Sequence, residues 1–107
     1  MKILAILAAL FLSIGYGYAQ TYEKFVEKSF DFLDKNDLVS AEESLRAAMR
    51  LEPGNPNNYA LLMNLGTIQR RQGKLEDALL SYTAALSRHP NNEAILENRA
   101  GLIYGNG

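Results

Sequence analysis

A motif that recurs after 37 residues restricts this chain to very few kinds of fold. Each copy mixes large and small apolar residues at helical spacing and ends in proline: Leu38, Ala41, Ser44, Leu45, Ala48, Met49 and Pro53 correspond to Leu75, Ala78, Ser81, Tyr82, Ala85, Leu86 and Pro90. Residues three or four positions apart share one face of a helix, and the alanines allow a second helix to approach that face closely. Because a unit this short cannot bury its own apolar face, the motif predicts helical units stacked on one another.

Five helices are predicted after residue 21, since no segment there shows the strict alternation of a β-strand. We expect them at about residues 22–34, 38–51, 56–72, 75–88 and from 93 onward. Asn36 and Gly73 suit left-handed turns after the first and third helices. Asn55 is expected to cap the third helix, with Pro56 in its first turn, and the asparagines at 91–92 to cap the fifth. The chain is therefore predicted to be all-α.

The first 19 residues have the pattern of a secretory signal peptide. Met1 and Lys2 give a positive start, residues 3–14 are almost wholly apolar, and small residues precede Gln20. A retained membrane anchor is the alternative, but an apolar run of about 12 residues is shorter than the roughly 20 that span a bilayer. We predict cleavage between Ala19 and Gln20, no stable membrane anchor afterwards, and export to the periplasm or out of the cell.

The composition argues against several classes of function. A formal charge of -1 provides no basic field for nucleic acid. The chain has no cysteine, so disulfides and the usual lipid attachment are excluded, and it has no zinc-ligand spacing or phosphate-binding glycine-rich loop. The single histidine, His89, precedes a proline at a predicted helix end and has no acid or thiol placed to activate it. We therefore expect neither an enzyme nor a protein that binds a cofactor or metal.

Residues 59–92 resemble the tetratricopeptide repeat, a helix–turn–helix unit of about 34 residues. The residues that carry the resemblance stand at the family's spacings: Leu62, Leu65, Gly66, Gly73, Leu75, Ala78, Tyr82, Ala85 and Pro90. Gln69 departs from the pattern, because the family usually has a tyrosine there. The resemblance implies stacked helix pairs forming a short right-handed α-solenoid, which would occupy residues 20–107.

Two further units flank this repeat. The first, residues 22–55, departs from the family at Lys28, where leucine is expected, and its final loop makes it about three residues longer than the usual unit of roughly 34. A partial repeat at residues 93–107 stops at Gly107, the position of a turn glycine. Because repeat arrays normally end in a complete unit or a polar capping helix, we expect a longer protein or a surface that awaits a partner. The alternative is that the fifth helix acts as the cap.

In this family the first helix of each repeat lines the concave face of the superhelix, and the resemblance implies the same here. By register that face holds Glu23, Val26, Glu27, Phe30, Leu33, Asp34, Ala60, Met63, Asn64, Thr67, Arg70, Arg71, Ala94, Glu97, Asn98, Gly101 and Tyr104. The candidates for partner binding among them are Val26, Phe30, Met63, Asn64, Thr67, Arg70, Arg71 and Tyr104. Met63 near Phe30 would provide an adaptable apolar surface for a peptide. The alternative is that the apolar members, above all Val26 and Leu33, pack against neighbouring helices.

The polar candidates allow more than one interpretation. Some family members hold the C-terminal carboxylate of chaperone tails with lysines, an arginine and asparagines on this face. Only Asn64 matches that set here, and Val26 and Phe30 stand at two of the other positions, so we reject a carboxylate clamp. Arg70 and Arg71 would attract an acidic segment, or they form a solvated helix end that the helix dipole favours.

These observations predict an exported, non-catalytic protein whose concave face binds another protein or a peptide. The alternative is a structural role, in which the units stack end to end or self-associate through the edge of the C-terminal helix.

Overall fold

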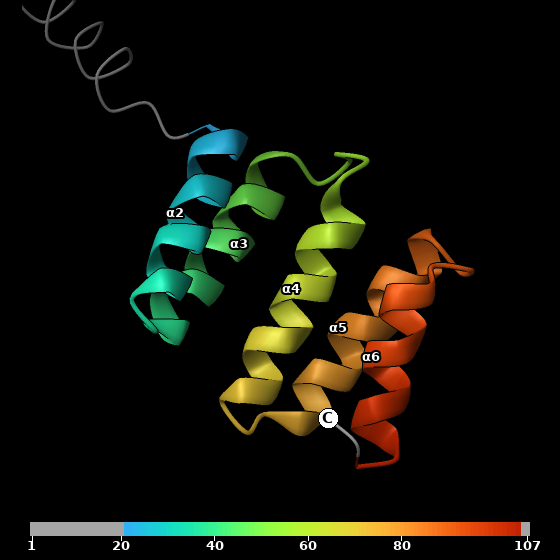
Figure 1. Cartoon of the computed structure of the whole chain (residues 1–107). Helices are drawn as coiled ribbons and strands as arrows, with labels where there is room; N and C mark the ends of the chain where they lie inside the picture. Colours follow the sequence, from blue (N-terminus) through green and yellow to red (C-terminus); the bar gives the residue numbers. More distant parts are fainter. Residues whose placement is uncertain (1–20, 106–107) are drawn as a thin grey trace, which may run out of the picture.

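The computed structural model describes residues 21–105, and within that range it contains five helices and no strand (Figure 1). The helices are α2 (Tyr22–Asp34), α3 (Leu38–Leu51), α4 (Asn58–Arg71), α5 (Leu75–Arg88) and α6 (Glu93–Ile103). The all-α fold predicted from the sequence is confirmed. The predicted signal peptide, residues 1–19, lies outside the described residues. Among the helices that are described, none has the length and apolar character needed to cross a membrane.

Short polar side chains cap the starts of three of the five described helices. Thr21, Asp37 and Asn92 each accept a hydrogen bond from the backbone N–H three residues further on, at 3.1 Å. Such caps satisfy N–H groups that have no partner within the helix. Asn36 and Gly73 have φ angles of 58° and 79°, the left-handed conformation predicted for both turns.

The start of α4 differs from the prediction. The helix begins at Asn58, and Asn55 lies outside it, accepting a hydrogen bond from the backbone N–H of Asn57 at 2.8 Å. The buried Asn58 side chain explains the shift, because its amide nitrogen donates to the carbonyl oxygens of Glu52 (2.8 Å) and Pro53 (3.3 Å). The long connection between α3 and α4 is thus folded around Asn58, and the predicted cap at Asn55 is wrong.

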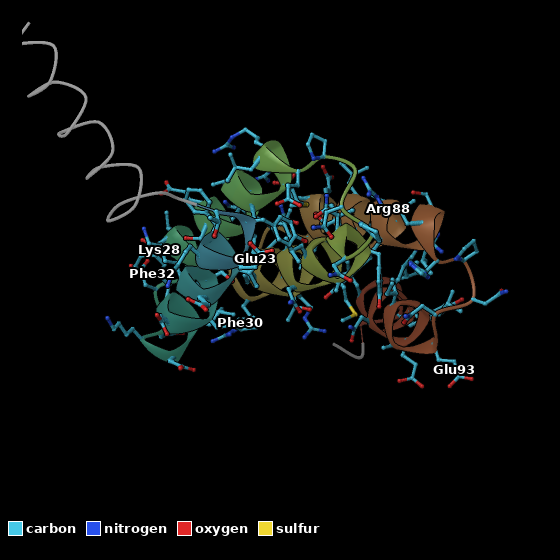
Figure 2. All side chains as sticks on the ribbon, turned by 90° about the horizontal axis from the view of Figure 1, so that it is seen from above. Glu23, Lys28, Phe30, Phe32, Arg88 and Glu93 are labelled. Carbon is cyan, nitrogen blue, oxygen red and sulfur yellow. The ribbon has the colours of Figure 1, made fainter. Side chains whose placement is uncertain are left out.

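The five helices form two layers, with α2, α4 and α6 in one and α3 and α5 in the other (Figure 2). Consecutive helices pack against each other along the whole array, and α4 also contacts α6. One apolar cluster joins α2, α3 and α4 and consists of Tyr22, Ala41, Leu45, Ala48, Leu61, Leu65 and Ile68. A second cluster joins α5 and α6 and consists of Ala78, Tyr82, Ala85, Leu86 and Ile95. Leu62 of α4 packs against both clusters, so α4 is the central helix of the array.

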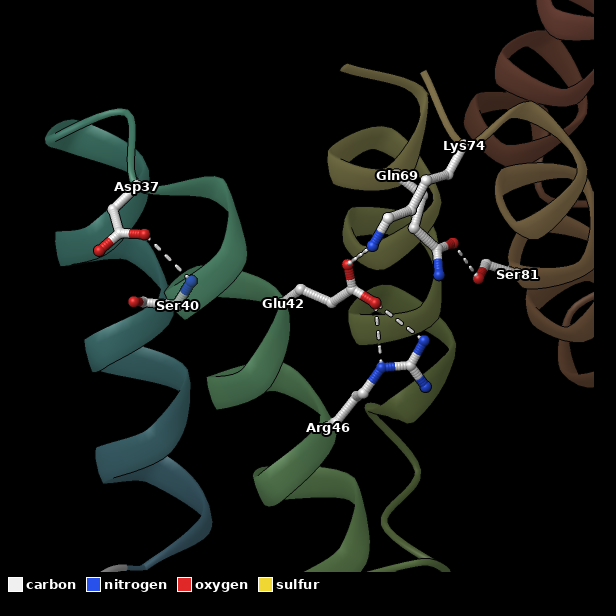
Figure 3. A network of polar contacts seen from close by, with 7 residues as sticks. All are labelled: Asp37, Ser40, Glu42, Arg46, Gln69, Lys74 and Ser81. Carbon is white, nitrogen blue, oxygen red and sulfur yellow. Dashed lines mark hydrogen bonds and ion pairs between the residues drawn. The ribbon is translucent and has the colours of Figure 1, made fainter. Parts of the chain in front are cut away.

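A polar network crosses the junction between the two helix pairs (Figure 3). The Glu42 carboxylate of α3 accepts hydrogen bonds from Arg46 Nε (3.1 Å) and Nη2 (2.9 Å) and from Lys74 Nζ (3.3 Å) in the turn before α5. Burial raises the pKa of Glu42, but the hydrogen bonds and charges of Arg46 and Lys74 outweigh it and hold that pKa below its ordinary value. Gln69 of α4 lies 2.6 Å from Ser81 Oγ of α5 and belongs to the same network.

Gln69 occupies the position where the family pattern has tyrosine, and its surroundings account for the difference. The side chain is 2% exposed, so its amide must find partners inside the protein. With its nitrogen facing Ser81 Oγ (2.6 Å) and the Asp77 carbonyl oxygen (3.0 Å), its oxygen accepts from Arg46 Nη2 at 3.2 Å. In that orientation the amide is fully paired and connects the two helix pairs.

Candidate functional site

The predicted partner-binding face corresponds to the layer of α2, α4 and α6, and its apolar members differ in exposure. Phe30 is 49% exposed, whereas Val26 and Met63 are half-buried and pack against the first and second apolar clusters. Phe30 projects from a different side of α2 than Lys28 and Phe32 do (Figure 2). The structure therefore leaves Phe30 available for contact, while Val26 and Met63 combine core packing with partial exposure.

The polar candidates on α4 are partly committed to structural hydrogen bonds. Thr67 Oγ1 donates to the carbonyl oxygen of Met63 (3.2 Å) and lies 2.8 Å from the Tyr82 hydroxyl, which joins α4 to α5. Arg71 Nη2 donates to Asn36 Oδ1 at 3.0 Å and so ties the end of α4 to the turn between α2 and α3. Asn64 and Arg70 are half-buried. Within residues 21–105, the Asn64 and Arg70 side chains make no such structural hydrogen bond.

Tyr104 lies apart from the other candidates. It follows the last residue of α6 and is 76% exposed. Because α6 and α2 stand at opposite ends of the array (Figure 1), a ligand that touches both Tyr104 and Phe30 must extend across the whole layer.

Lys28, where the family pattern has leucine, lies on the outer side of α2 with Phe32 (Figure 2). The corresponding residue of the second repeat is Leu65, which is 3% exposed in the core. An open hollow of about 510 Å³ between α2 and α3 has Lys28 and Phe25 in its lining, and Lys28 Nζ lies 5.7 Å from the centre of the Phe25 ring. The lysine fits here because no described helix covers this end of the array.

The structure has a cleft at the start of α2 and α4 that was not predicted from the sequence. It has a volume of about 360 Å³ and is lined by Tyr22, Glu23, Val26, Glu27, Asn55, Asn57 and Leu61. Val26 was among the predicted binding residues, and Glu23 and Glu27 were placed on the same face, but the contribution of the α3–α4 connection was missed. The signal that could have shown it is the extra length of that connection.

The cleft exists because α2 and α4 are held apart. No Cα atom of α2 comes within 8 Å of one in α4, whereas α4 and α6 approach more closely. Two hydrogen bonds bridge the gap at its ends: the Tyr22 hydroxyl donates to Asn58 Oδ1 at 2.9 Å, and Arg71 donates to Asn36 at 3.0 Å. These two hydrogen bonds connect the elements on either side of the opening.

Within residues 21–105 no group of three or more His, Asp or Glu side chains could hold a metal ion. The ring of His89 packs against that of Tyr59, with 3.9 Å between the ring centres. This contact gives His89 a packing role at the junction between α5 and α4.

The comparison with protein families locates one repeat. Residues 59–92 match the family model described as "Tetratricopeptide repeat". This chain carries a tetratricopeptide repeat. The match starts in α4 and ends just before α6, so it covers the helix pair that holds Gly66, Tyr82 and the second apolar cluster.

A solved structure and two curated proteins are similar over most of the chain. A tetratricopeptide repeat protein from Parabacteroides merdae ATCC 43184 has a TM-score of 0.77 and 71% sequence identity, covering 78% of this chain and 33% of that one. The Homo sapiens protein O-mannosyl-transferase TMTC1 is 36% identical over 80 residues, and the photosystem I assembly protein Ycf3 of Synechococcus sp. (strain CC9605) is 34% identical over 68. The chain spans 9% of the first curated protein and 39% of the second. The chain thus corresponds to a part of each of these longer proteins.

Proposed function

We propose that this chain is a non-catalytic module that binds a protein or peptide on the face of α2, α4 and α6. The observation that carries the proposal is the exposure of Phe30, a large apolar side chain that is 49% accessible on a layer with an opening between its first two helices. Val26 and Met63 contribute half-buried apolar surface on the same layer. Aromatic and methionine side chains of this kind are enriched where protein partners bind. The family match to residues 59–92 supports the same function, because stacked helical repeats present extended binding surfaces.

The proposal includes export and excludes catalysis. The apolar segment of residues 3–14, followed by small residues before Gln20, supports a cleaved signal peptide and a location in the periplasm or outside the cell. The absence of cysteine throughout the sequence excludes thiol chemistry, and within residues 21–105 no cluster of side chains could hold a metal ion. A formal charge of -1 supports a protein partner rather than nucleic acid.

Selection from a random displayed-peptide library tests this function. Peptides enriched on the purified protein should lose most of their binding to a variant that carries Phe30→Ala and Met63→Ala. Leu80→Ala is the matched control, because Leu80 is an equally apolar residue, 68% exposed, on α5 in the other layer. Failure to enrich any peptide, or enriched peptides that bind the double variant as well as the wild type, would show that this face is not the binding site.

A structural role is the second candidate, and one observation favours it. Leu96 and Ile103 are 41% and 52% exposed on α6, and their spacing of seven residues places them on one side of the helix. Ile95 points the other way and is fully buried in the second apolar cluster. The edge of α6 is thus a narrow apolar stripe through which two chains would associate.

A further inference from the structure

The cleft between α2 and α4 combines an apolar floor with a rim of carboxylates. Tyr22 and Leu61 are each 5% exposed at its base and Val26 is half-buried, whereas Glu23 and Glu27 are exposed at its edge. Its volume of about 360 Å³ lies near the lower limit for ligand pockets. The cleft therefore suits one or two side chains of an extended segment rather than a folded surface.

The charges around the cleft are predominantly negative. Burial raises the pKa of the Tyr22 hydroxyl, and the negative charges of Glu52 and Glu23 raise it further. Glu27 adds a third carboxylate, and Lys24 pairs with it, with Nζ 3.4 Å from Glu27 Oε2. Both partners of that ion pair are exposed, so it is weak and readily exchanged. On the other wall, α4 presents only uncharged residues before its last turn.

The helix dipole does not account for this arrangement by itself. Glu23 lies in the first turn of α2, where a negative charge stabilises the helix, but Glu27 lies beyond that turn. The neighbouring repeat provides an internal comparison, because the residues 37 positions further on are Ala60 and Asn64. The two carboxylates thus belong to the wider opening between α2 and α4 and have no acidic counterpart on α4.

We infer that this cleft binds a lysine or arginine side chain that stands next to an apolar residue in the partner segment. The inference rests on the proposed function and specifies the chemistry that the partner presents to the α2 end of the face. The aliphatic stem of the cation would pack on Tyr22, Val26 and Leu61. Its charged head would reach Glu23 and Glu27 at the rim, as long cationic side chains do when they cross an apolar surface.

A nuclear magnetic resonance titration of the isotope-labelled purified protein tests the inference with a defined probe. The probe is the peptide Gly-Leu-Lys-Leu-Gly, and two further peptides have glutamine or glutamate in place of lysine. The lysine peptide should shift the backbone amide signals of Glu23, Val26 and Asn57. Its dissociation constant should be lower than that of the glutamine peptide by about threefold or more, the difference expected for exposed ion pairs. The glutamate peptide should bind most weakly.

A pair of charge variants identifies the carboxylates that are responsible. Glu23→Gln with Glu27→Gln should abolish the preference for lysine over glutamine while the signals of α5 and α6 stay unchanged. Glu93→Gln with Glu97→Gln is the matched control, because these two exposed residues have the same spacing in the first turns of α6, at the opposite end of the array (Figure 2). The control removes the same net charge and should leave the preference intact.

Three results would overturn the inference: no shift at the cleft with the lysine peptide, equal binding of the lysine and glutamine peptides, or an equal loss of preference in the control variant. Each of them leaves the peptide selection on Phe30 and Met63 as an independent measurement. The proposed function fails if no peptide is enriched or if the selected peptides bind equally well without those two side chains. A failure of the inference about the cleft can therefore be distinguished from a failure of the proposed function.

Discussion

The ring of Tyr82 lies directly against the backbone of Gly66, so that a Cβ atom on Gly66 would come within 2.7 Å of the ring carbon Cε1. Neither side can easily yield. Tyr82 is fully buried, and its hydroxyl is held 2.8 Å from Thr67 Oγ1. This contact brings α4 and α5 together at the centre of the matched repeat.

Gly66→Ala should destabilise the protein because the added methyl group overpacks the contact with Tyr82. The expected loss in the free energy of unfolding is about 1–3 kcal/mol. Chemical denaturation measures it, with Gly54→Ala as the control. Gly54 has open space around its Cα and an ordinary backbone conformation, so its substitution should have little effect. Equal stability of the two variants would contradict the contact.

The first helix pair suggests how to relieve that clash. At the positions 37 residues earlier, Ser29 stands in place of Gly66 and Leu45 in place of Tyr82, and both are buried. In the first helix pair, the second helix thus has a residue smaller than tyrosine, Leu45, where the first helix has a residue larger than glycine, Ser29. Gly66→Ser combined with Tyr82→Leu should cost less than the sum of the two single changes, with a coupling of about 1 kcal/mol or more. Simple additivity would show that the two residues do not constrain each other.

Acid should weaken the contribution of Glu42 to stability. Its pKa is lower in the folded protein than in the unfolded chain, so the stabilisation is fully present above about pH 4.3 and is lost as the pH falls through the folded value. Glu42→Gln should therefore lower the unfolding free energy at neutral pH and matter less and less in acid. Because Arg46 and Lys74 are each 48% exposed, the effect should not exceed about 1 kcal/mol.

Denaturation curves of wild type and Glu42→Gln between neutral pH and about pH 3 measure this difference. Glu43→Gln is the control, because Glu43 is the next residue in α3 and is exposed. A difference between wild type and Glu42→Gln that does not change with pH would mean that packing, and not charge, makes Glu42 important.

Apart from the start of α4, the helix ends and the small-residue contacts were predictable because they depend on neighbours in the sequence. Apolar spacing located α2, α3 and α5, and the left-handed preferences of Asn36 and Gly73 located their turns. The alanines of the repeated motif, among them Ala41 and Ala78, are fully buried as predicted.

The cleft and the start of α4 were not predictable in the same way, because they depend on a contact between distant residues. Tyr22 and Asn58 are 36 positions apart, and no local pattern connects the first residue of one helix with the first residue of another. Asn55 and Pro56 satisfied the local rules for a helix start, but the burial of Asn58 decided where α4 begins. The extra loop length was visible in the sequence, whereas its consequence, the wider opening between α2 and α4, required the structure.

Asn58→Ala should destabilise the α3–α4 connection and its link to α2. The substitution leaves the buried Tyr22 hydroxyl without its acceptor and removes the hydrogen bonds to the Glu52 and Pro53 carbonyl oxygens, at a cost of about 1–3 kcal/mol. Asn57→Ala is the control, because Asn57 is exposed and its side chain makes no capping bond. Tyr22→Phe should cost less in the Asn58→Ala background than in the wild type, and an equal cost in both would contradict the hydrogen bond.

The proposed export predicts where the mature chain begins. Protein recovered from the producing cell should begin at Gln20, because the apolar segment and the small residues before it have the pattern that signal peptidase cleaves. Intact mass spectrometry measures this directly. Ala19→Lys serves as the comparison, since a charged residue at the cleavage site should block processing and leave the longer chain. Wild-type protein recovered from the membrane with Met1 or Lys2 still attached would contradict the signal peptide.

The apolar edge of α6 separates partner binding from self-association. If Leu96 and Ile103 are an association surface, the purified chain should form dimers or larger species in analytical ultracentrifugation, and it should enhance the fluorescence of a hydrophobic dye. Leu96→Lys with Ile103→Lys should abolish both effects, because two charges would then have to be buried at the contact.

Phe30→Ala with Met63→Ala is the matched variant on the other candidate surface, the face of α2, α4 and α6. Association that survives the α6 variant and disappears with the Phe30 and Met63 variant would identify the α2–α4–α6 face as the contact between chains. A wild-type chain that is monomeric at high concentration and does not bind the dye would remove the basis for a structural role, and binding of a different protein or peptide would then be the remaining proposal.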